Sequence, residues 1–289
     1  MTATGTTRPA TGARRLRRPR GLTAHIILIL AVLISVFPFV WTIIMATNTT
    51  RDIYKSPPKL TFGSHLLENI RHVLNTIDFF GSMLNTVIVA SVTTVLVLFI
   101  DSLAAFAFAK FDFPGRKLLF GLLLGFMMLP LQLAVLPQFI LMSKIGWVGM
   151  LKALTLPSLA NAFGIFWLRQ YIENGVPDEL LDAARMDGAG FFRQYWNIAL
   201  PMIRPAMSFL AIYAFVNAWN DYVWPLIVLT NPDHVTLQVE LAQLNVAHNT
   251  DYSMVMAGVL MASIPLVVVF SIFARGFIAG ATEGAVQGS

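Results

Sequence analysis

Long runs of apolar residues alternate with short polar segments along this chain, and the runs have the length of membrane-spanning helices. A helix needs roughly 20 apolar residues to cross a hydrocarbon core of about 30 Å. The first run is too long for the apolar region of a signal peptide, and no small-residue cleavage site follows it. The pattern therefore predicts six spans, over residues 22–47, 82–109, 118–142, 150–171, 205–229 and 253–278.

Two polar segments flank the first span. Residues 1–21 are rich in Arg, Thr and Gly, a composition that predicts a disordered basic terminus. Residues 48–81 contain apolar positions at helical spacing, which predicts a surface helix on the membrane or the bundle, with Ser64 as its cap. Residues 22–289 are then expected to form a single six-span transmembrane domain.

Composition supports an all-α integral membrane protein. Hydrophobic residues make up 56% of the 289 positions and charged residues 12%, about half the charged share of a soluble domain. The absence of cysteine excludes disulfides and thiolate metal sites. The net charge of +5 reflects six arginines within the first 20 residues, without an aromatic and basic pattern, so no nucleic-acid partner is predicted.

The distribution of Lys and Arg predicts the orientation. With the N-terminus inside, the inner segments hold fourteen Lys and Arg residues and the outer segments hold six. Because cytoplasmic loops carry the excess of positive charge, both termini are expected in the cytoplasm. The same count places the loop of residues 172–204 in the cytoplasm.

That loop is the most polar long segment between two spans. Pro177 suits a first helical position, and the acidic residues after it suit the positive end of a helix dipole. Gly188 provides the left-handed residue that ends a helix, and residues 191–199 can form a second one. The sequence thus predicts two short helices that meet at a glycine and form a surface to which another protein can bind.

No catalytic, metal-binding or cofactor-binding residues are predicted. The chain has no G-x-x-x-x-G-K-[ST], H-E-x-x-H or G-x-S-x-G pattern, and its five histidines are scattered at membrane edges and in loops. An enzyme embedded in the membrane is therefore the less favoured alternative.

Polar residues inside the spans are the candidates for a substrate path, because charge in lipid is costly unless it faces a cavity or partner. Four residues of the fifth span are spaced to share one helix face, opposite Trp219: Asn217, Asn220, Asp221 and Trp224. Their amide, carboxylate and indole groups together suit the binding of a sugar. Alternatively, this stripe packs against another subunit and Asp221 is structural. Gln132 is a weaker candidate. Asp101 is expected to be structural, meeting Lys110 or a helix end.

The sequence DAARMDGA (182–189), followed by IALP (198–201), resembles the EAA loop of ABC importer permeases, with Asp182 at the position where glutamate is usual. WNDYVWPL (219–226) resembles a signature of the carbohydrate-uptake, MalG-like branch. The resemblance implies that loop 172–204 couples to an ATPase. The residues it implies for this contact are Glu179, Asp182, Ala183, Ala184, Asp187, Gly188 and Ala189.

The resemblance also implies partners. These are a second, different permease subunit, two ATPase subunits that hold ATP and Mg, and an extracytoplasmic sugar-binding protein that delivers a small-molecule carbohydrate. The expected location is the lipid bilayer of a prokaryotic plasma (inner) membrane, and no cofactor is expected in this chain itself. A glycerol-phosphate importer of the same family stays open, as does a proton-coupled secondary transporter that uses Asp101 and Asp221.

Overall fold

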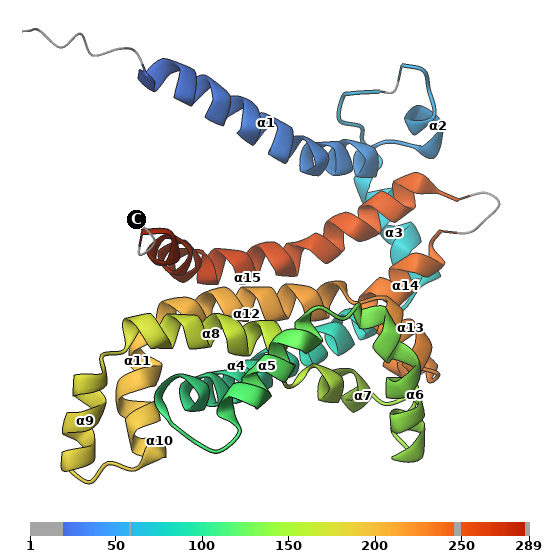
Figure 1. Ribbon diagram of the computed structural model, residues 1–289. Helices are drawn as coiled ribbons and strands as arrows, with labels where there is room; N and C mark the ends of the chain where they lie inside the picture. Colours follow the sequence, from blue (N-terminus) through green and yellow to red (C-terminus); the bar gives the residue numbers. More distant parts are fainter. Residues whose placement is uncertain (1–19, 58, 246–249, 287–289) are drawn as a thin grey trace, which may run out of the picture.

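The computed structural model describes residues 20–57, 59–245 and 250–286, and within these ranges every regular element is a helix. The all-α prediction is therefore confirmed for the described part of the chain. Of residues 1–21, which were predicted to be disordered, residues 1–19 lie outside the described part, and the last two instead begin α1. Within the described ranges three helices are long and apolar enough to cross a membrane, namely α1 (Arg20–Thr47), α4 (Phe79–Lys110) and α15 (Tyr252–Val286), and the number rises to five if each of two bent helix pairs is one span. Figure 1 shows α4 and α15 running alongside one another with α12 between them.

The third predicted span is bent rather than straight. α5 (Arg116–Met127) is followed by a 3₁₀ turn (Leu131–Ala134) and α6 (Val135–Lys144), and the two helices meet at 99°. Pro130 precedes the turn in an extended conformation. Since proline has no N–H and its ring clashes with the preceding helical turn, the helix ends there.

The fourth predicted span is interrupted as well. It begins with α7 (Lys152–Thr155) and a 3₁₀ turn (Leu156–Ser158), and only then continues as α8 (Ala162–Gly175). Asn161 stands extended before α8, and its side chain accepts a hydrogen bond from the N–H of Gly164 at 3.0 Å. This cap starts a new helix in the middle of the apolar run.

The fifth predicted span is divided into α12 (Arg204–Asn220) and α13 (Val223–Val228). The helix stops because Asp221 has an extended backbone, with φ −67° and ψ 123°. A 3₁₀ turn (Pro232–His234) and α14 (Leu237–Gln243) then lead to α15. Because it ends at Asn220, α12 has 17 residues, which correspond to about 25 Å of helix at 1.5 Å per residue.

The predicted surface helix between the first two spans is α3 (Leu66–Thr76), which follows the short α2 (Thr50–Ile53). Asn69 anchors it by donating to the carbonyls of Ala46 and Asn48 at the end of α1. The prediction of Ser64 as its cap is wrong, because His65 stands at the capping position and makes no side-chain capping bond. The His65 imidazole contacts Glu68 instead, at 2.9 Å.

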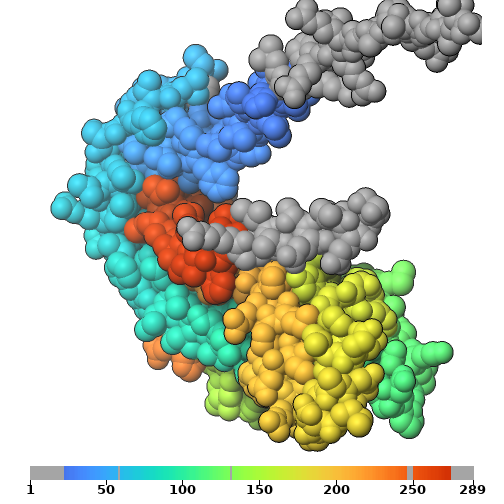
Figure 2. Space-filling model, turned by 90° about the vertical axis from the view of Figure 1, so that its left-hand side faces the viewer, coloured from blue at the N-terminus to red at the C-terminus, as the bar shows by residue number. Residues whose placement is uncertain are grey.

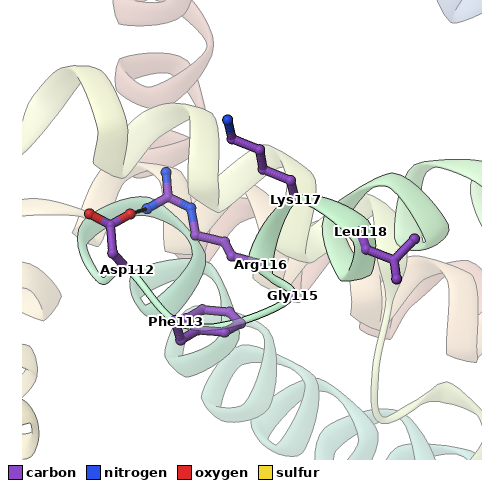
Figure 3. Close-up of a pocket in the computed structure, with 6 residues that line it drawn as sticks. All are labelled: Asp112, Phe113, Gly115, Arg116, Lys117 and Leu118. Carbon is purple, nitrogen blue, oxygen red and sulfur yellow. Dashed lines mark hydrogen bonds and ion pairs between the residues drawn. The ribbon is translucent and has the colours of Figure 1, made fainter.

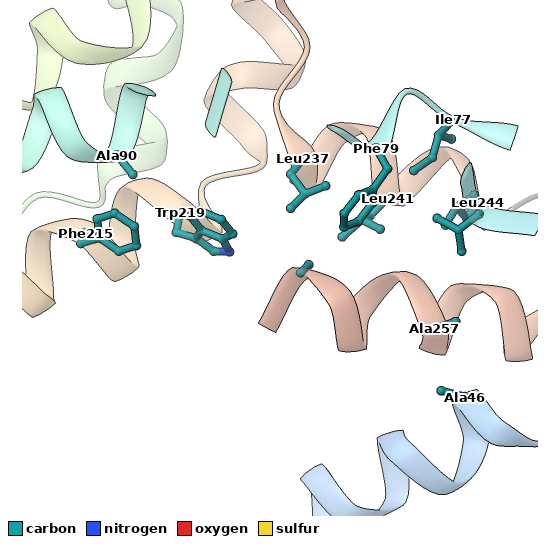
Figure 4. Packing of buried hydrophobic residues seen from close by; sticks show 12 residues of the cluster. Ala46, Ile77, Phe79, Ala90, Phe215, Trp219, Leu237, Leu241, Leu244 and Ala257 are labelled. Atoms are coloured by element: carbon teal, nitrogen blue, oxygen red, sulfur yellow. The ribbon is translucent and has the colours of Figure 1, made fainter. Parts of the chain in front are cut away.

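Three buried clusters hold the described part of the bundle together, the smallest of them between α4, α6, α7 and α13. Figure 4 shows the first, in which side chains of α4, α12, α14 and α15 meet, including Ala90, Phe215, Trp219, Leu241 and Ala257. The second lies nearer the other end of the bundle and includes Ala105, Phe106, Leu168, Tyr195 and Leu210. By contrast, residues 23–40 of α1 are all exposed and apolar for the most part, as suits a helix whose solvent is lipid.

The segments that were predicted to share one side of the membrane lie at one end of the structure. Figure 1 places the start of α1, the end of α15 and the loop containing α9 (Asp178–Met186) and α10 (Phe191–Gln194) at this end. Figure 2 looks onto the same end and shows the yellow residues of α9 and α10 exposed on the surface. α2, α3, α13 and α14 lie at the opposite end.

Candidate functional site

The loop of residues 172–204 folds as two short helices that meet at a glycine, as predicted. α9 ends at Met186, and Gly188 follows with φ +77°. α10 then continues into a π-helical turn (Tyr195–Ala199) and α11 (Leu200–Met202). Pro177 stands just before the first helical residue, one position earlier than predicted, where its φ of −63° and missing N–H still suit the start of α9.

Gly188 is required by its backbone and not by a lack of space. A left-handed φ costs a residue with a Cβ roughly 1 kcal/mol or more, whereas glycine adopts it freely. A Cβ added at this position would meet no atom of the chain within 4 Å. The Gly188 and Ala189 N–H groups close the end of α9 by donating to Arg185 and Ala184 carbonyls.

The outer surface of this loop combines acidic and apolar side chains. Most of the residues that the resemblance assigns to ATPase coupling are exposed: Glu179, Asp182, Ala183, Asp187 and Gly188. The other two, Ala184 and Ala189, are half-buried. Met186 is 89% exposed and Phe192 is 64% exposed, although both are large and apolar. Such exposed apolar residues at a turn are typical of a protein-docking surface.

The inner surface of the loop is anchored to the end of α4. Lys110 Nζ lies 2.8 Å from Asp178 Oδ1, which joins the last residue of α4 to the first residue of α9. The Arg185 guanidinium pairs with Asp182 at 2.9 Å and lies over the Phe111 ring. Phe106, Phe111 and Phe191 then pack with ring centroids 5.0 to 5.4 Å apart. No local sequence pattern indicated this anchor, because its residues come from distant segments.

The expectation that Asp101 meets Lys110 is wrong, and the alternative, a helix end, is confirmed. Asp101 is fully buried on α4, and its Oδ1 accepts the backbone N–H of Asn161 at 3.0 Å. A Cβ on Gly164 would lie 2.1 Å from Asp101 Oδ2. The carboxyl group therefore fixes the start of α8 against α4, and the two helices approach this closely only because residue 164 is glycine.

The predicted stripe on the fifth span does not share one helix face, so that prediction is wrong. The helix ends at Asn220, and Trp224 lies on the separate α13. Trp224 is buried and donates from Nε1 to the Ala153 carbonyl of α7 at 3.1 Å. A tryptophan held in this way stabilises the packing of α13 against α7, and its indole N–H is not free for a sugar.

Asn217 and Asn220 remain as exposed polar residues on α12. Their amide groups donate to backbone carbonyls one turn earlier, at 2.7 and 2.9 Å, and the Asn220 carbonyl oxygen also lies 3.5 Å from Gln238 Nε2. Trp219 points into the core, as predicted from its position opposite them. Gln132 lies exposed on the 3₁₀ turn between α5 and α6.

A shallow depression of 440 Å³ lies at the turn between α4 and α5. Figure 3 shows its lining, in which Arg116 reaches back to Asp112 at 2.6 Å and Lys117 points away from this pair. The Arg116 guanidinium also donates to the Phe111 carbonyl. These bonds fix the turn beside the loop of residues 172–204.

Residues 101–279 match a family described as "Binding-protein-dependent transport system inner membrane component". This range contains the loop of residues 172–204 as well as α12, α13 and most of α15. The match therefore includes both the candidate docking surface and the exposed amides of α12.

Two similar proteins and one similar structure extend this match. The lactose transport system permease protein LacG of Rhizobium radiobacter is 34% identical over 264 residues, which are 91% of this chain and 96% of LacG. The sn-glycerol-3-phosphate transport system permease protein UgpE of Yersinia pestis is 31% identical over 275 residues, 92% of this chain and 98% of UgpE. A chain of a bacterial ABC transporter involved in alginate import shares the fold, with a TM-score of 0.76, 22% identity and coverage of 89% of this chain and 96% of that one.

Proposed function

The chain belongs to the family of binding-protein-dependent transport system inner membrane components, and we propose that it forms one half of the sugar path of an ATP-driven importer. The observation that carries this proposal is the structure of the loop of residues 172–204, which we call the coupling loop. Its two helices present exposed apolar and acidic residues at one end of the bundle, while Lys110 and Asp178 tie its inner side to α4. A protein that binds this surface and moves it therefore also moves the helices of the bundle.

The proposed topology has six spans and both termini in the cytoplasm. Three spans are the long helices α1, α4 and α15, and the others are built around α5, α8 and α12. α8 has only 14 residues, which is too few to cross a bilayer alone. The outer half is completed by α6, α7 and α13, whose residues Met142, Ala153, Trp224 and Val228 bury one another. Broken helices are tolerated at membrane depth when protein covers their free backbone groups.

The proposed partners follow from what this chain lacks and what its loop presents. ATP and Mg would be held by two ATPase subunits, and a second permease subunit would complete the path. An extracytoplasmic binding protein would deliver the substrate at the end where α2, α3 and α14 lie. This arrangement sits in the plasma (inner) membrane of a prokaryote.

The proposed mechanism is a movement and involves no chemical step in this chain. When the ATPase subunits close around ATP, they displace α9 and α10. The anchored loop transmits this displacement to the spans, which then switch the sugar path from inward-facing to outward-facing access. Asn217 and Asn220 are exposed, and their amide oxygens can accept hydrogen bonds from sugar hydroxyl groups, that of Asn220 in exchange for its long contact with Gln238.

Glycerol phosphate is the alternative to a sugar as the substrate. The similarity to LacG favours a sugar, whereas the similarity to UgpE favours glycerol phosphate. α12 carries no Lys or Arg between Pro205 and Asn220, so the helix that holds Asn217 and Asn220 offers a phosphate no cation beside them. We therefore propose a sugar or oligosaccharide.

The test is reconstitution of the complete complex in liposomes with its own binding protein. The rate of ATP hydrolysis is measured while mono-, di- and oligosaccharides and glycerol 3-phosphate are added one at a time. We expect one sugar class to stimulate hydrolysis and to accumulate inside. Stimulation by glycerol 3-phosphate alone would mean that the substrate is glycerol phosphate and not a sugar. Sugar uptake by the isolated chain would refute the permease-subunit proposal.

A further inference from the structure

The coupling loop and α4 share a buried hydrogen bond that lies away from the Lys110–Asp178 ion pair. Tyr195 Oη and Ser102 Oγ are 2.6 Å apart, and neither residue is more than 1% exposed. Ser102 Oγ also lies 2.6 Å from the carbonyl of Leu98 in its own helix. A carbonyl can only accept, so the single hydroxyl hydrogen of Ser102 goes to Leu98, and Tyr195 is the donor to Ser102.

Tyr195 is also tied to the tip of the loop. It follows Gln194, whose buried Nε2 donates to the Ala189 carbonyl at 2.6 Å, next to the turn at Gly188. Tyr195 is the first residue of the π-helical turn. Such turns are rare and occur often at functional sites. A continuous set of bonds therefore runs from the turn at the tip of the loop to Ser102 in the last third of α4.

The bond matters because α4 lies far from the loop in the sequence, whereas α12 follows the loop directly. Between them, Ile203 has a non-helical backbone, and the segment of residues 191–202 meets α12 at 82°. A bend of this kind can act as a hinge, about which a displaced loop rotates. Without a firm contact to α4, such a rotation would move the loop and leave α4 in place.

We propose that Tyr195 is a positioning residue that, by its hydrogen bond to Ser102, makes α4 follow the coupling loop when the ATPase subunits move it. This inference rests on the proposed importer function. The Tyr195 ring supports the bond by packing against Phe106 of α4, with centroids 5.9 Å apart. The Trp196 ring of the same turn also stacks on Phe99 of α4 at 6.3 Å, so one polar and two aromatic contacts join the π-helical turn to a helix that is distant in the sequence.

The test compares three variants of the reconstituted complex. Tyr195→Phe removes only the hydroxyl group, and Ser102→Ala leaves that hydroxyl group buried without its acceptor. The double variant has neither group, and replacing both partners of a buried bond by apolar groups restores much of the lost stability. Thr94→Ala is the matched control, because the Thr94 hydroxyl group donates to the Ala90 carbonyl of its own helix at 2.7 Å and lies eight residues before Ser102.

Two quantities are measured for each variant, the yield of assembled complex and the number of sugar molecules transported per ATP. We expect Ser102→Ala to have the lowest yield and the double variant to recover it. Transport per ATP should fall about two- to tenfold in both Tyr195→Phe and the double variant, the range that one net hydrogen bond supports. Thr94→Ala should keep the wild-type ratio.

The outcomes separate the two proposals. If the wild-type complex hydrolyses ATP in response to sugar but Tyr195→Phe and the double variant keep its transport per ATP, the inference about Tyr195 is wrong and the importer function stands. Recovery of both yield and transport ratio in the double variant would show a purely structural bond and overturn the inference too. A wild-type complex without any sugar response would refute the importer function itself.

Discussion

Lys110 and Asp178 form an ion pair of 2.8 Å although 68 positions separate them in the sequence. The two side chains differ in solvent exposure: that of Lys110 is 5% exposed, whereas that of Asp178 is 76% exposed. Removing the aspartate therefore leaves an ammonium group largely buried without its counter-charge. Removing the lysine leaves a carboxylate that water already solvates.

This asymmetry predicts unequal effects of the two neutral variants. Asp178→Asn should lower the yield of assembled complex more than Lys110→Met does, and the double variant should lie close to Lys110→Met. Because one partner is solvated, the pair itself contributes no more than about 1 kcal/mol. Yields after purification at low salt test this order, and equal losses in both single variants would contradict it.

Gly188→Val should abolish ATP-driven uptake while the protein still inserts and the binding protein still loads sugar. Valine at φ +77° costs roughly 1 kcal/mol or more, so the turn between α9 and α10 must change its path. Gly190→Ala is the control, because Gly190 has an ordinary φ of −73° and open space around it. Uptake and sugar-stimulated hydrolysis are measured for both. Normal values for Gly188→Val would mean that this loop is not the coupling element.

Asn217→Leu and Asp221→Leu should act differently. Asn217 is exposed on α12, so its change should reduce sugar uptake and leave assembly intact. Asp221 is half-buried and stands at the break between α12 and α13, so its change should lower the yield of the complex. Yield and uptake are recorded together. Unchanged uptake by Asn217→Leu would remove this residue from the proposed sugar path.

Trp224→Phe should lower the stability of the complex and leave its choice of sugar unchanged. The substitution leaves the buried Ala153 carbonyl without the donor that lies 3.1 Å away, at a cost of about 1–3 kcal/mol. The midpoint of thermal inactivation in liposomes reports this loss. A changed order of preference among sugars, at unchanged stability, would instead place the indole in the sugar path.

Gly164→Ala should prevent assembly, because the added Cβ would lie 2.1 Å from Asp101 Oδ2. Adding Asp101→Ala should recover part of the yield, since it removes the clashing carboxyl group. Gly175→Ala in the same helix is the control, with its nearest contact at 3.6 Å. The yield of membrane-inserted protein distinguishes the variants. A normal yield for Gly164→Ala would show that α8 does not pack this closely on α4.

Much of the coupling loop was predictable because its determinants are local. Gly188 adopts a left-handed backbone that its own lack of a Cβ permits, and the acidic residues of α9 lie at the positive end of their own helix. The residues that anchor the loop were not predictable. Tyr195 meets Ser102, and Phe191 meets Phe106, only after the chain has folded.

The sequence by itself determined the membrane character, the long helices α1, α4 and α15, and the helix–glycine–helix loop. These features depend on the average hydropathy of a window or on the φ preference of one residue. The tertiary structure decided where the other apolar runs break. Hydropathy reports how apolar a segment is and not whether its backbone hydrogen bonds continue. The breaks near Asn161 and Asp221 persist because Asp101 accepts the Asn161 N–H and Trp224 reaches Ala153, and both partners come from other parts of the chain.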